Sequence, residues 1–418
     1  MEKRKLIEMG TLSRGRSQHR PRNDLKLYGG KYPFIQTGDV KNANLYIEKY
    51  SQTYNDFGLN QSKLWPENTL CITIAANIAD TGILSFPACF PDSIIGFTAT
   101  KGKTDVRYVK YCFDLLQKSI QNMSKGSTQD NLSMEKLEQL EFNCPSFENQ
   151  QKIAAVLSSL DDKIALNNRI NAKLEQMAKR LYDYWFVQFD FPNADGKPYK
   201  SNGGKMVWNE ELKREIPEGW EVKSINDISV SYRGVGYTAD DEKSETDENV
   251  VLILRGNNIS NNHIVFDSNT VYLDKTFVSP DQEIHKFDLV MTMSSGSKEH
   301  VGKSAMFLYD SSHSYGAFCN KITPNEDCQY FLENYLHSEY FKKYIKVTCS
   351  GTGINNLTNE HFDKAKFAFP DDEVLNAFNE KMKAIYEKRG VLEQENLKLT
   401  SMRDKLLPLL MNGQVVVE

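Results

Sequence analysis

The sequence predicts an α+β protein with two similar globular domains, separated by two long antiparallel helices that form a coiled coil, in a pseudo-twofold tandem duplication. Three observations predict this. The second half of the 418-residue chain repeats the first half in order. Each half ends in a long stretch with apolar residues three and four apart, the heptad spacing of packed helices. The rest of each half contains short β-branched and aromatic runs between turns rich in Gly, Asn and Asp.

The repeat is clearest at the end of each globular part. GSTQDNLSMEKLEQLEFNCP (126–145) and GTGINNLTNEHFDKAKFAFP (351–370) share six residues at one constant offset. Near the start of each half, the pair Arg14-Gly15 matches Arg233-Gly234. An internal repeat takes priority over single motifs, because missing it misassigns the whole fold. The repeat predicts globular domains over 1–145 and 216–370.

The globular domains are predicted to mix strands and helices. Helices are expected over 105–123 and 328–346. The segment 191–215, which is rich in Gly and polar residues, is expected to be the linker to the second domain. Runs with the composition of buried strands are LCITIA (70–75), IIGFTA (94–99), VVLIL (250–254) and DLVMTM (288–293).

Two long helices are predicted over 146–190 and 371–412. A helix of about 40 residues is roughly 60 Å long, and neither helix can bury its apolar stripe alone. The simplest burial is against the other helix, in antiparallel packing. Polar residues in such a seam weaken the packing but fix its register. The predicted seam includes Leu160, Ile164, Asn171, Leu174 and Leu181 in the first helix and Met382, Ile385, Asn396, Leu399 and Leu406 in the second.

The composition excludes several classes of protein. With 40% hydrophobic and 26% charged residues, the chain is globular rather than disordered. No stretch approaches the roughly 18 to 20 apolar residues of a membrane span, and the start lacks the apolar core of a signal peptide. A cytoplasmic protein without membrane contact is therefore expected. The seven cysteines include no CxxC pair and indicate reduced thiols rather than a metal site.

Three segments resemble the specificity subunits of type I restriction-modification enzymes. QQKIAAVLSSLDDKIALNNRINAKLEQMAKRLYDYWFVQF (150–189) is similar to that family's central conserved helix. IPEGWEVKSINDI (216–228) resembles the family's entry into its second target-recognition domain, and GTGINNLT (351–358) resembles the exit from it. The resemblance covers nearly the whole chain, and the helices carry most of it.

The resemblance implies a DNA-binding subunit that catalyses nothing alone. Residues 1–145 and 216–370 would each read one half of a gapped site in double-stranded DNA, and the helices would space them. The resemblance also implies two adenine methyltransferase subunits, which hold S-adenosylmethionine and flip the target base. Motor-nuclease subunits that use ATP and magnesium would complete the complex. No cofactor is expected in this chain.

Basic residues near predicted loops are the candidate DNA contacts. Residues 1–31 carry nine basic and three acidic side chains, and Arg or Lys there can contact phosphates or the guanine edge. A solvated basic loop explains them equally well, and an arginine just before a glycine can instead stabilise the turn. The acidic run 240–248 is most simply a solvated loop. The candidates are Arg14, Arg16, Arg20, Arg22, Lys101, Lys103 and Arg107 in the first domain and Arg233, Arg255, Lys298 and Lys303 in the second.

Two other classes of function stay open. One is a coiled-coil scaffold whose duplicated domains bind proteins, and the other is a stand-alone DNA-modifying enzyme with an unrecognised site. GSKEHVGKS (296–304) is similar to a phosphate-binding loop, but five residues separate its glycines instead of four. The matching segment around Gly82 has no lysine, so the glycine is interpreted as shared backbone geometry.

Overall fold

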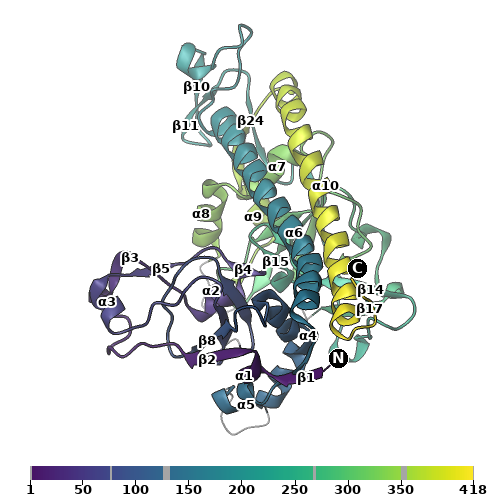
Figure 1. The fold of residues 1–418 in the computed structure, drawn as a ribbon. Coiled ribbons are helices and arrows are strands. Elements are labelled where there is room, and N and C mark those ends of the chain that lie inside the picture. The colour runs from purple at the N-terminus through teal and green to yellow at the C-terminus, as the bar shows by residue number, and fades with distance from the viewer. Residues whose placement is uncertain (1, 76–77, 126–131, 267–269, 350–354, 418) are drawn as a thin grey trace. The chain divides into compact units, whose positions relative to one another are not determined.

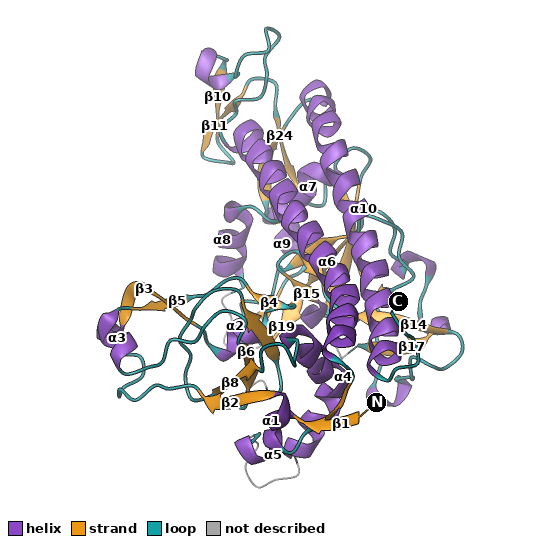
Figure 2. Ribbon diagram, in the orientation of Figure 1, coloured by secondary structure: helices purple, strands orange, loops and turns teal. Residues whose placement is uncertain are grey.

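The computed structural model describes residues 2–75, 78–125, 132–266, 270–349 and 355–417. The first residues of both repeat motifs, at 126–131 and 351–354, lie outside this part of the chain. Contacts between residues divide the chain into two units, and both units mix helices with strands (Figure 2). Unit 1 contains 1–169 and 394–418, and unit 2 contains 170–393. The boundaries between the units cut both long helices, because each part of a helix packs on the globular part beside it.

Unit 1 is built on one sheet with the strand order β2-β8-β6-β7-β4. All of its pairings are antiparallel except that of β4 with β7. A separate pair, β1 with β9, brings the first and last strands of the globular part together, with Glu2 opposite Cys144. The strands are β1 (Glu2–Lys5), β2 (Gly10–Arg14), β4 (Tyr46–Ile47), β6 (Leu70–Thr73), β7 (Thr81–Leu84), β8 (Ile94–Ala99) and β9 (Glu141–Cys144), and β3 (Tyr28–Phe34) pairs with β5 (Gln52–Tyr54) outside this sheet.

The core of unit 1 joins the sheet to the long helices. The helix α4 (Val106–Lys125) confirms the helix expected from the sequence, and it buries Tyr108 and Phe113 completely. These side chains belong to one cluster with Phe97 of the sheet, Ile153 and Leu157 of α6 (Phe147–Tyr182), and Leu410 and Met411 of α10 (Asp372–Met411). The shorter helices are α1 (Leu6–Met9), α2 (Thr37–Lys41), α3 (Asp56–Asn60) and α5 (Met134–Glu138).

Unit 2 contains a sheet with the order β13-β22-β18-β20. In chain order these are the first, fourth, second and third strands of the sheet, as are β2-β8-β6-β7 in the unit 1 sheet when its edge strand β4 is left out. The pair β12 with β24 closes this domain as β1 with β9 closes the first. A second sheet has the order β17-β14-β21. The strands are β12 (Glu221–Ser224), β13 (Ser229–Arg233), β14 (Val250–Leu254), β17 (Val271–Asp274), β18 (Leu289–Thr292), β20 (Ser304–Met306), β21 (Ser314–Tyr315), β22 (Cys319–Pro324) and β24 (Lys366–Phe369).

The helical part of unit 2 corrects one expectation. The single helix predicted over 328–346 is wrong, because the chain forms α7 (Gln329–Leu336) and α8 (Glu339–Thr348). The break has a local cause: the Ser338 hydroxyl accepts a hydrogen bond from the Phe341 amide at 3.2 Å and caps the start of α8. The other secondary elements of unit 2 are α9 (Asn359–Lys364), β10 (Met206–Asn209), β11 (Arg214–Pro217), β15 (Ile259–Ser260), β16 (His263–Ile264), β19 (Ser294–Ser295) and β23 (Asn355–Asn356).

The long helices α6 and α10 lie side by side within each unit (Figure 1). In unit 1, Arg403 donates to Asp161 at 3.0 Å, and the side chain of Asn167 donates to Asn396 at 2.9 Å. In unit 2, Glu175 contacts Arg389, and Tyr182 contacts Phe378. In each unit, residue numbers at successive contacts rise along α6 and fall along α10, so the helices are antiparallel there.

The predicted seam positions all lie wholly or partly buried. Ile164, Asn171 and Met382 are buried, and the other seven are half-buried. Their burial is not only against the partner helix, as the sequence had indicated. Met382 belongs to the main cluster of unit 2, and Leu406 packs on that of unit 1. The helices are thus parts of the domain cores as well as partners of each other. Within the described ranges, no helix is long and apolar enough to cross a membrane.

Replacing Gly15 with alanine is expected to destabilise unit 1 by about 1 to 3 kcal/mol, the usual cost of overpacking. The new Cβ would lie 2.2 Å from the backbone oxygen of Pro91, next to the hydrogen bond from the Gly15 amide to Ile94. Gly38→Ala is the matched control, because nothing lies within 4 Å of the Cβ it would add. Denaturant unfolding of the purified chain measures both, and equal stability of the two variants would contradict the expectation.

Candidate nucleic-acid interface

The four arginines at the end of β2 and in the loop after it are exposed, but each already has a partner in unit 1. Arg14 donates from Nε to the backbone oxygen of Asp92 at 2.8 Å, and Arg22 forms an ion pair with the Asp92 carboxylate at 2.8 Å. Arg20 donates to the backbone oxygens of Ser17 and His19, and Arg16 donates to Gln18. These contacts stabilise the loop and connect it to the segment around Asp92. They favour the interpretation of Arg14 as a residue that stabilises the turn before Gly15.

The other three candidates of unit 1 fall into two groups. Lys101 and Lys103 are exposed in the turn after β8. Arg107 is half-buried at the start of α4, where it pairs with Asp105 at 2.9 Å. The hydrogen bond with Asp105 raises the pKa of the Arg107 guanidinium. Arg107 is therefore engaged in the fold, and the two lysines are the ones open to solvent.

Arg233 occupies the same position in unit 2 as Arg14 does in unit 1. Both are the last residue of a five-residue strand with the same order of buried and exposed side chains. Both precede a buried glycine, and a Cβ on Gly234 would lie 2.3 Å from the backbone oxygen of Gly316. The two strand ends therefore share their burial pattern and a glycine with no room for a Cβ.

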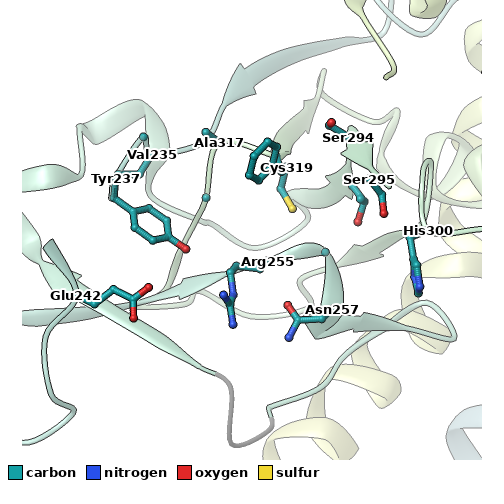
Figure 3. Close-up of a pocket in the computed structure, with 15 residues that line it drawn as sticks. Val235, Tyr237, Glu242, Arg255, Asn257, Ser294, Ser295, His300, Ala317 and Cys319 are labelled. Carbon is teal, nitrogen blue, oxygen red and sulfur yellow. The ribbon is translucent and has the colours of Figure 1, made fainter. Parts of the chain in front are cut away.

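Unit 2 contains a cavity of about 570 Å³ at the ends of β13, β14 and β18 (Figure 3). Arg255, one of the predicted DNA contacts, lines this cavity. Its other polar side chains come from separate segments, and Phe318 at its border is 69% exposed. The polar and aromatic lining residues are Tyr237, Glu242, Arg255, Asn257, Thr292, Ser294, Ser295, His300 and Phe318.

Hydrogen bonds through Asn258 hold the turn that carries Arg255. The Arg255 amide donates to the side-chain oxygen of Asn258 at 2.9 Å, and the Asn258 amide group donates to the Val265 backbone oxygen at 3.0 Å. Asn258 is completely buried. The Arg255 guanidinium also lies near Tyr237: burial raises the pKa of the Tyr237 phenol, and the arginine opposes that rise. Arg255 and Asn257 therefore project from a rigid turn.

The loop 296–303 lies beside this cavity and is not a nucleotide site. A phosphate-binding loop connects a strand to a helix, whereas this loop connects β18 and β19 to strand β20. Gly302 has a φ of +79°, but Gly82 lies inside strand β7 without a left-handed backbone. The interpretation of these glycines as shared geometry is therefore wrong. A Cβ on Gly82 would instead lie 2.8 Å from the Ile47 side chain.

The loop 296–303 carries two lysines and one glutamate, Glu299, and is therefore weakly basic. Lys298 is exposed, and Lys303 contacts the ring of His300 at 3.1 Å. Glu242, from the acidic run 240–248, lies on the opposite side of Arg255 (Figure 3). The acidic run is thus not only a solvated loop, since one of its side chains lines the cavity. The described residues contain no group of three or more His, Cys, Asp or Glu side chains that could hold a metal ion.

Sequence reasoning missed most of the cavity. Arg255 was a candidate because it is basic, and Lys298 and Lys303 lie in the adjacent loop. The neutral lining residues Tyr237, Asn257 and Phe318 carry no sequence signal, since each type is common in ordinary turns. The one available signal was position in the sequence: Tyr237 closely follows the repeated pair Arg233-Gly234, and Asn257 follows Gly256.

A second polar cluster lies in unit 2 between α6, α7 and α10. Arg389 is 3% exposed and forms ion pairs with Glu175 at 3.1 Å and Glu333 at 3.3 Å. His263 of β16 contacts Glu175 at 3.1 Å and Glu393 at 4.0 Å. The hydrogen bond with Glu175 raises the pKa of His263, and burial raises the pKa of Glu393 to about 7. Charged groups thus occupy the centre of the helix seam.

Glu393→Gln is expected to flatten the loss of stability between about pH 4.5 and 7. Because the folded protein holds the Glu393 proton more tightly than the unfolded chain, its contribution is complete below the ordinary glutamate pKa. The contribution is lost as pH rises through about 7. Between pH 5 and pH 8, the free energy of unfolding of the variant should therefore change by roughly 1 to 3 kcal/mol less than that of the wild-type chain. Denaturant unfolding at both pH values tests this, with the exposed Glu387→Gln as control; identical pH slopes would refute it.

The sequence pattern of the type I restriction modification DNA specificity domain matches residues 1–176 and 217–399. The chain therefore belongs to this family. It is 25% identical to the type I restriction enzyme MjaIX specificity subunit of Methanocaldococcus jannaschii, over 99% of this chain and 93% of that protein. It is 27% identical to the HindI specificity subunit of Haemophilus influenzae, over 70% of this chain and 72% of that protein.

A solved structure has a similar fold. The S subunit of a type I restriction-modification system from M. genitalium superimposes with a TM-score of 0.56. The sequences are 16% identical, and the alignment covers 98% of this chain and 96% of that one. This likeness concerns the arrangement of helices and strands and does not extend to individual site residues.

Proposed function

We propose that this chain is the DNA specificity subunit of a type I restriction-modification complex and reads a bipartite, gapped site. Residues 1–145 would read one half-site, residues 216–370 the other, and the helices would space them. The observation that carries this proposal is the repeated strand order, β2-β8-β6-β7 in unit 1 and β13-β22-β18-β20 in unit 2. Two domains with the same strand order are suited to bind two separate half-sites on one DNA duplex.

The duplication and the coiled coil belong to this proposal. Equivalent closing strands, equivalent Arg-Gly corners and antiparallel contacts of α6 with α10 in each unit support a pseudo-twofold tandem repeat. Such symmetry suits two identical partners, one for each half of the chain. The cross-helix bonds of Asn396 with Asn167 and Asn168 support the expected role of polar seam residues in fixing register.

The partners we propose are two adenine methyltransferase subunits, joined by motor-nuclease subunits in the full complex. S-adenosylmethionine, ATP and magnesium would be held by those partners, and this chain would supply specificity and assembly without catalysis. Large apolar side chains on the long helices remain exposed and provide surface for docking a protein partner. These side chains are Leu166, Met177, Val391, Leu397 and Met402.

A chain with a formal net charge of -5 needs help to hold DNA firmly. Phosphate contacts dominate the affinity of DNA-binding proteins and make it salt-dependent. We therefore expect the methyltransferase subunits to contribute many of those contacts around the duplex. Binding by the isolated chain should be weak, and sequence-specific binding should appear when the methyltransferase is added.

Long-read methylation mapping of the host genome tests the function. The gene is deleted with the neighbouring methyltransferase gene intact and is then restored on a plasmid. Loss and recovery of one bipartite adenine-methylated motif supports the proposal. If the assembled chain and methyltransferase bind each other but no DNA sequence preferentially, the chain is a scaffold instead. Methyl transfer or cleavage by the chain alone would make it an enzyme.

A further inference from the structure

We propose that the cavity of unit 2 is the base-reading site for the second half-site, with Arg255 and Asn257 contacting base edges. In this proposal Lys298 and Lys303 of the neighbouring loop contact the DNA backbone. The inference rests on the proposed function and adds to it the residues that determine one half of the sequence. It divides one surface into a part that reads bases and a part that binds phosphates regardless of sequence.

The side chains at the centre of the cavity match the chemistry of purine edges. A guanidinium presents a rigid fork that pairs with O6 and N7 of guanine, and a side-chain amide pairs with N6 and N7 of adenine. Arg255 and Asn257 flank Gly256, and both side chains line the cavity (Figure 3). A Cβ on Gly256 would lie 3.0 Å from Thr292, so the turn packs closely on β18.

Preorganisation distinguishes these two residues from the other basic candidates. Hydrogen bonds through buried Asn258 hold the backbone of their turn, so little backbone freedom remains to be lost on binding. Arg14 and Arg22 donate to Asp92, and Arg20 donates to its own loop. The partner of the Arg255 guanidinium is Tyr237, which itself lines the cavity. Of these candidates, Arg255 lines the cavity of unit 2, which is large enough for base edges.

The border of the cavity supplies the two remaining parts of a DNA contact. Phe318 is a large aromatic side chain with 69% of its surface exposed, and a thymine methyl group or a base face would cover it. The cavity is also polarised by charge. His300 lies at one side, with Lys303 in contact with its ring and Lys298 in the same loop, and Glu242 lies at the other side. With Glu299 counted, the two lysines still leave that loop with a net positive charge, so a phosphate chain is attracted to the first side and repelled from the second.

The test uses the full chain expressed with its native partner genes, followed by methylation mapping. Arg255→Ala and Arg255→Lys should each relax one guanine position of the second half-site, with roughly a 5- to 150-fold loss of discrimination. Lysine keeps the charge but lacks the fork. Asn257→Ala should relax one adenine position of the same half-site. The first half-site and the spacer should stay unchanged.

Salt titration of DNA binding by the purified assembly separates the two roles. Lys298→Ala should weaken binding to all sequences equally and lower the salt slope by about one. The matched control is Lys343→Ala, another exposed lysine, on α8 of the same unit, and it should change neither motif nor slope. Arg255→Lys should keep the wild-type slope.

The outcomes separate this inference from the proposed function. If the wild-type chain directs a bipartite motif that Arg255→Ala and Asn257→Ala leave intact, the cavity does not read bases and the specificity function stands. A change in the first half-site or the spacer also overturns the assignment. If the wild-type chain directs no motif, the proposed function fails first. Because Asn257 is exposed, its variant decides the question even if Arg255→Ala fails to fold.

Discussion

Exchange of residues 1–145 for the corresponding domain of another type I specificity subunit is expected to replace one half of the recognised site completely. The second half and the spacing should remain those of the parent chain. The physical basis is the closure of the domain by β1 and β9, which places Glu2 opposite Cys144 beside the start of α6. The exchange therefore cuts one covalent connection to the rest of the chain.

The core of unit 1 makes this experiment more specific. Ile153 and Leu157 of α6, with Leu410 and Met411 of α10, pack in the same cluster as α4. A second chimera that exchanges 1–157 carries the first turns of α6 with the new domain and protects against a poorly packed junction. Methylation mapping reads the result, and specific sites are typically preferred by about 10³- to 10⁷-fold over other DNA. A change in both half-sites would contradict independent reading by the two domains.

Replacement of Arg389 by alanine is expected to lower the free energy of unfolding of unit 2 by about 3 to 5 kcal/mol. The loss leaves Glu333 and Glu175 without their main cationic partner, and the Glu333 side chain is only 5% exposed. Burying an unpaired carboxylate costs more than the original pair contributed. Lys388→Ala is the matched control: this side chain is exposed on the same helix, and such changes usually stay within about 0.5 kcal/mol.

Tryptophan fluorescence during denaturant unfolding reports mainly on unit 2, because Trp185, Trp208 and Trp220 lie there and one other tryptophan, Trp65, lies in unit 1. The triple variant Arg389→Met with Glu175→Gln and Glu333→Gln should recover much of the loss, since it removes the two carboxylates that pair with Arg389. If Arg389→Ala unfolds like the Lys388→Ala control, the ion pairs contribute nothing to stability and the buried cluster has been misjudged.

Regular elements were the most predictable part of the fold. The helix predicted over 371–412 corresponds to α10 within one residue at each end. The helix predicted over 146–190 corresponds to α6, which ends at Tyr182 and is followed by a π-helical segment to Val187. Heptad spacing over such a length is a local signal that packing rarely overrides. The helix predicted over 328–346 failed for the opposite reason. Its apolar spacing continues across Ser338, and one side-chain cap was enough to end a helix and begin another.

The candidate site was predicted only in part. Arg255, Lys298 and Lys303 could be selected by charge, and the structure places Arg255 in the cavity with the two lysines in the adjoining loop. Arg14, Arg20 and Arg22 have the same sequence signature but donate to nearby loop residues. Charge alone cannot separate these cases, because both kinds of arginine are exposed or half-buried beside a turn. Which of the eleven residues touch DNA stays a prediction.

The sequence by itself determined the repeat, the two long helices and the family, since these depend on periodicity and on residue order. Only the tertiary structure decided which charged side chains form ion pairs and which residues line a cavity. The cavity gathers segments around 237, 255, 294, 300 and 318 through the pairing of strands far apart in the chain. Arg389 meets Glu175 and Glu333 across three helices. A local sequence pattern cannot predict such contacts, because they join side chains from segments that are far apart in the chain and come together only on folding.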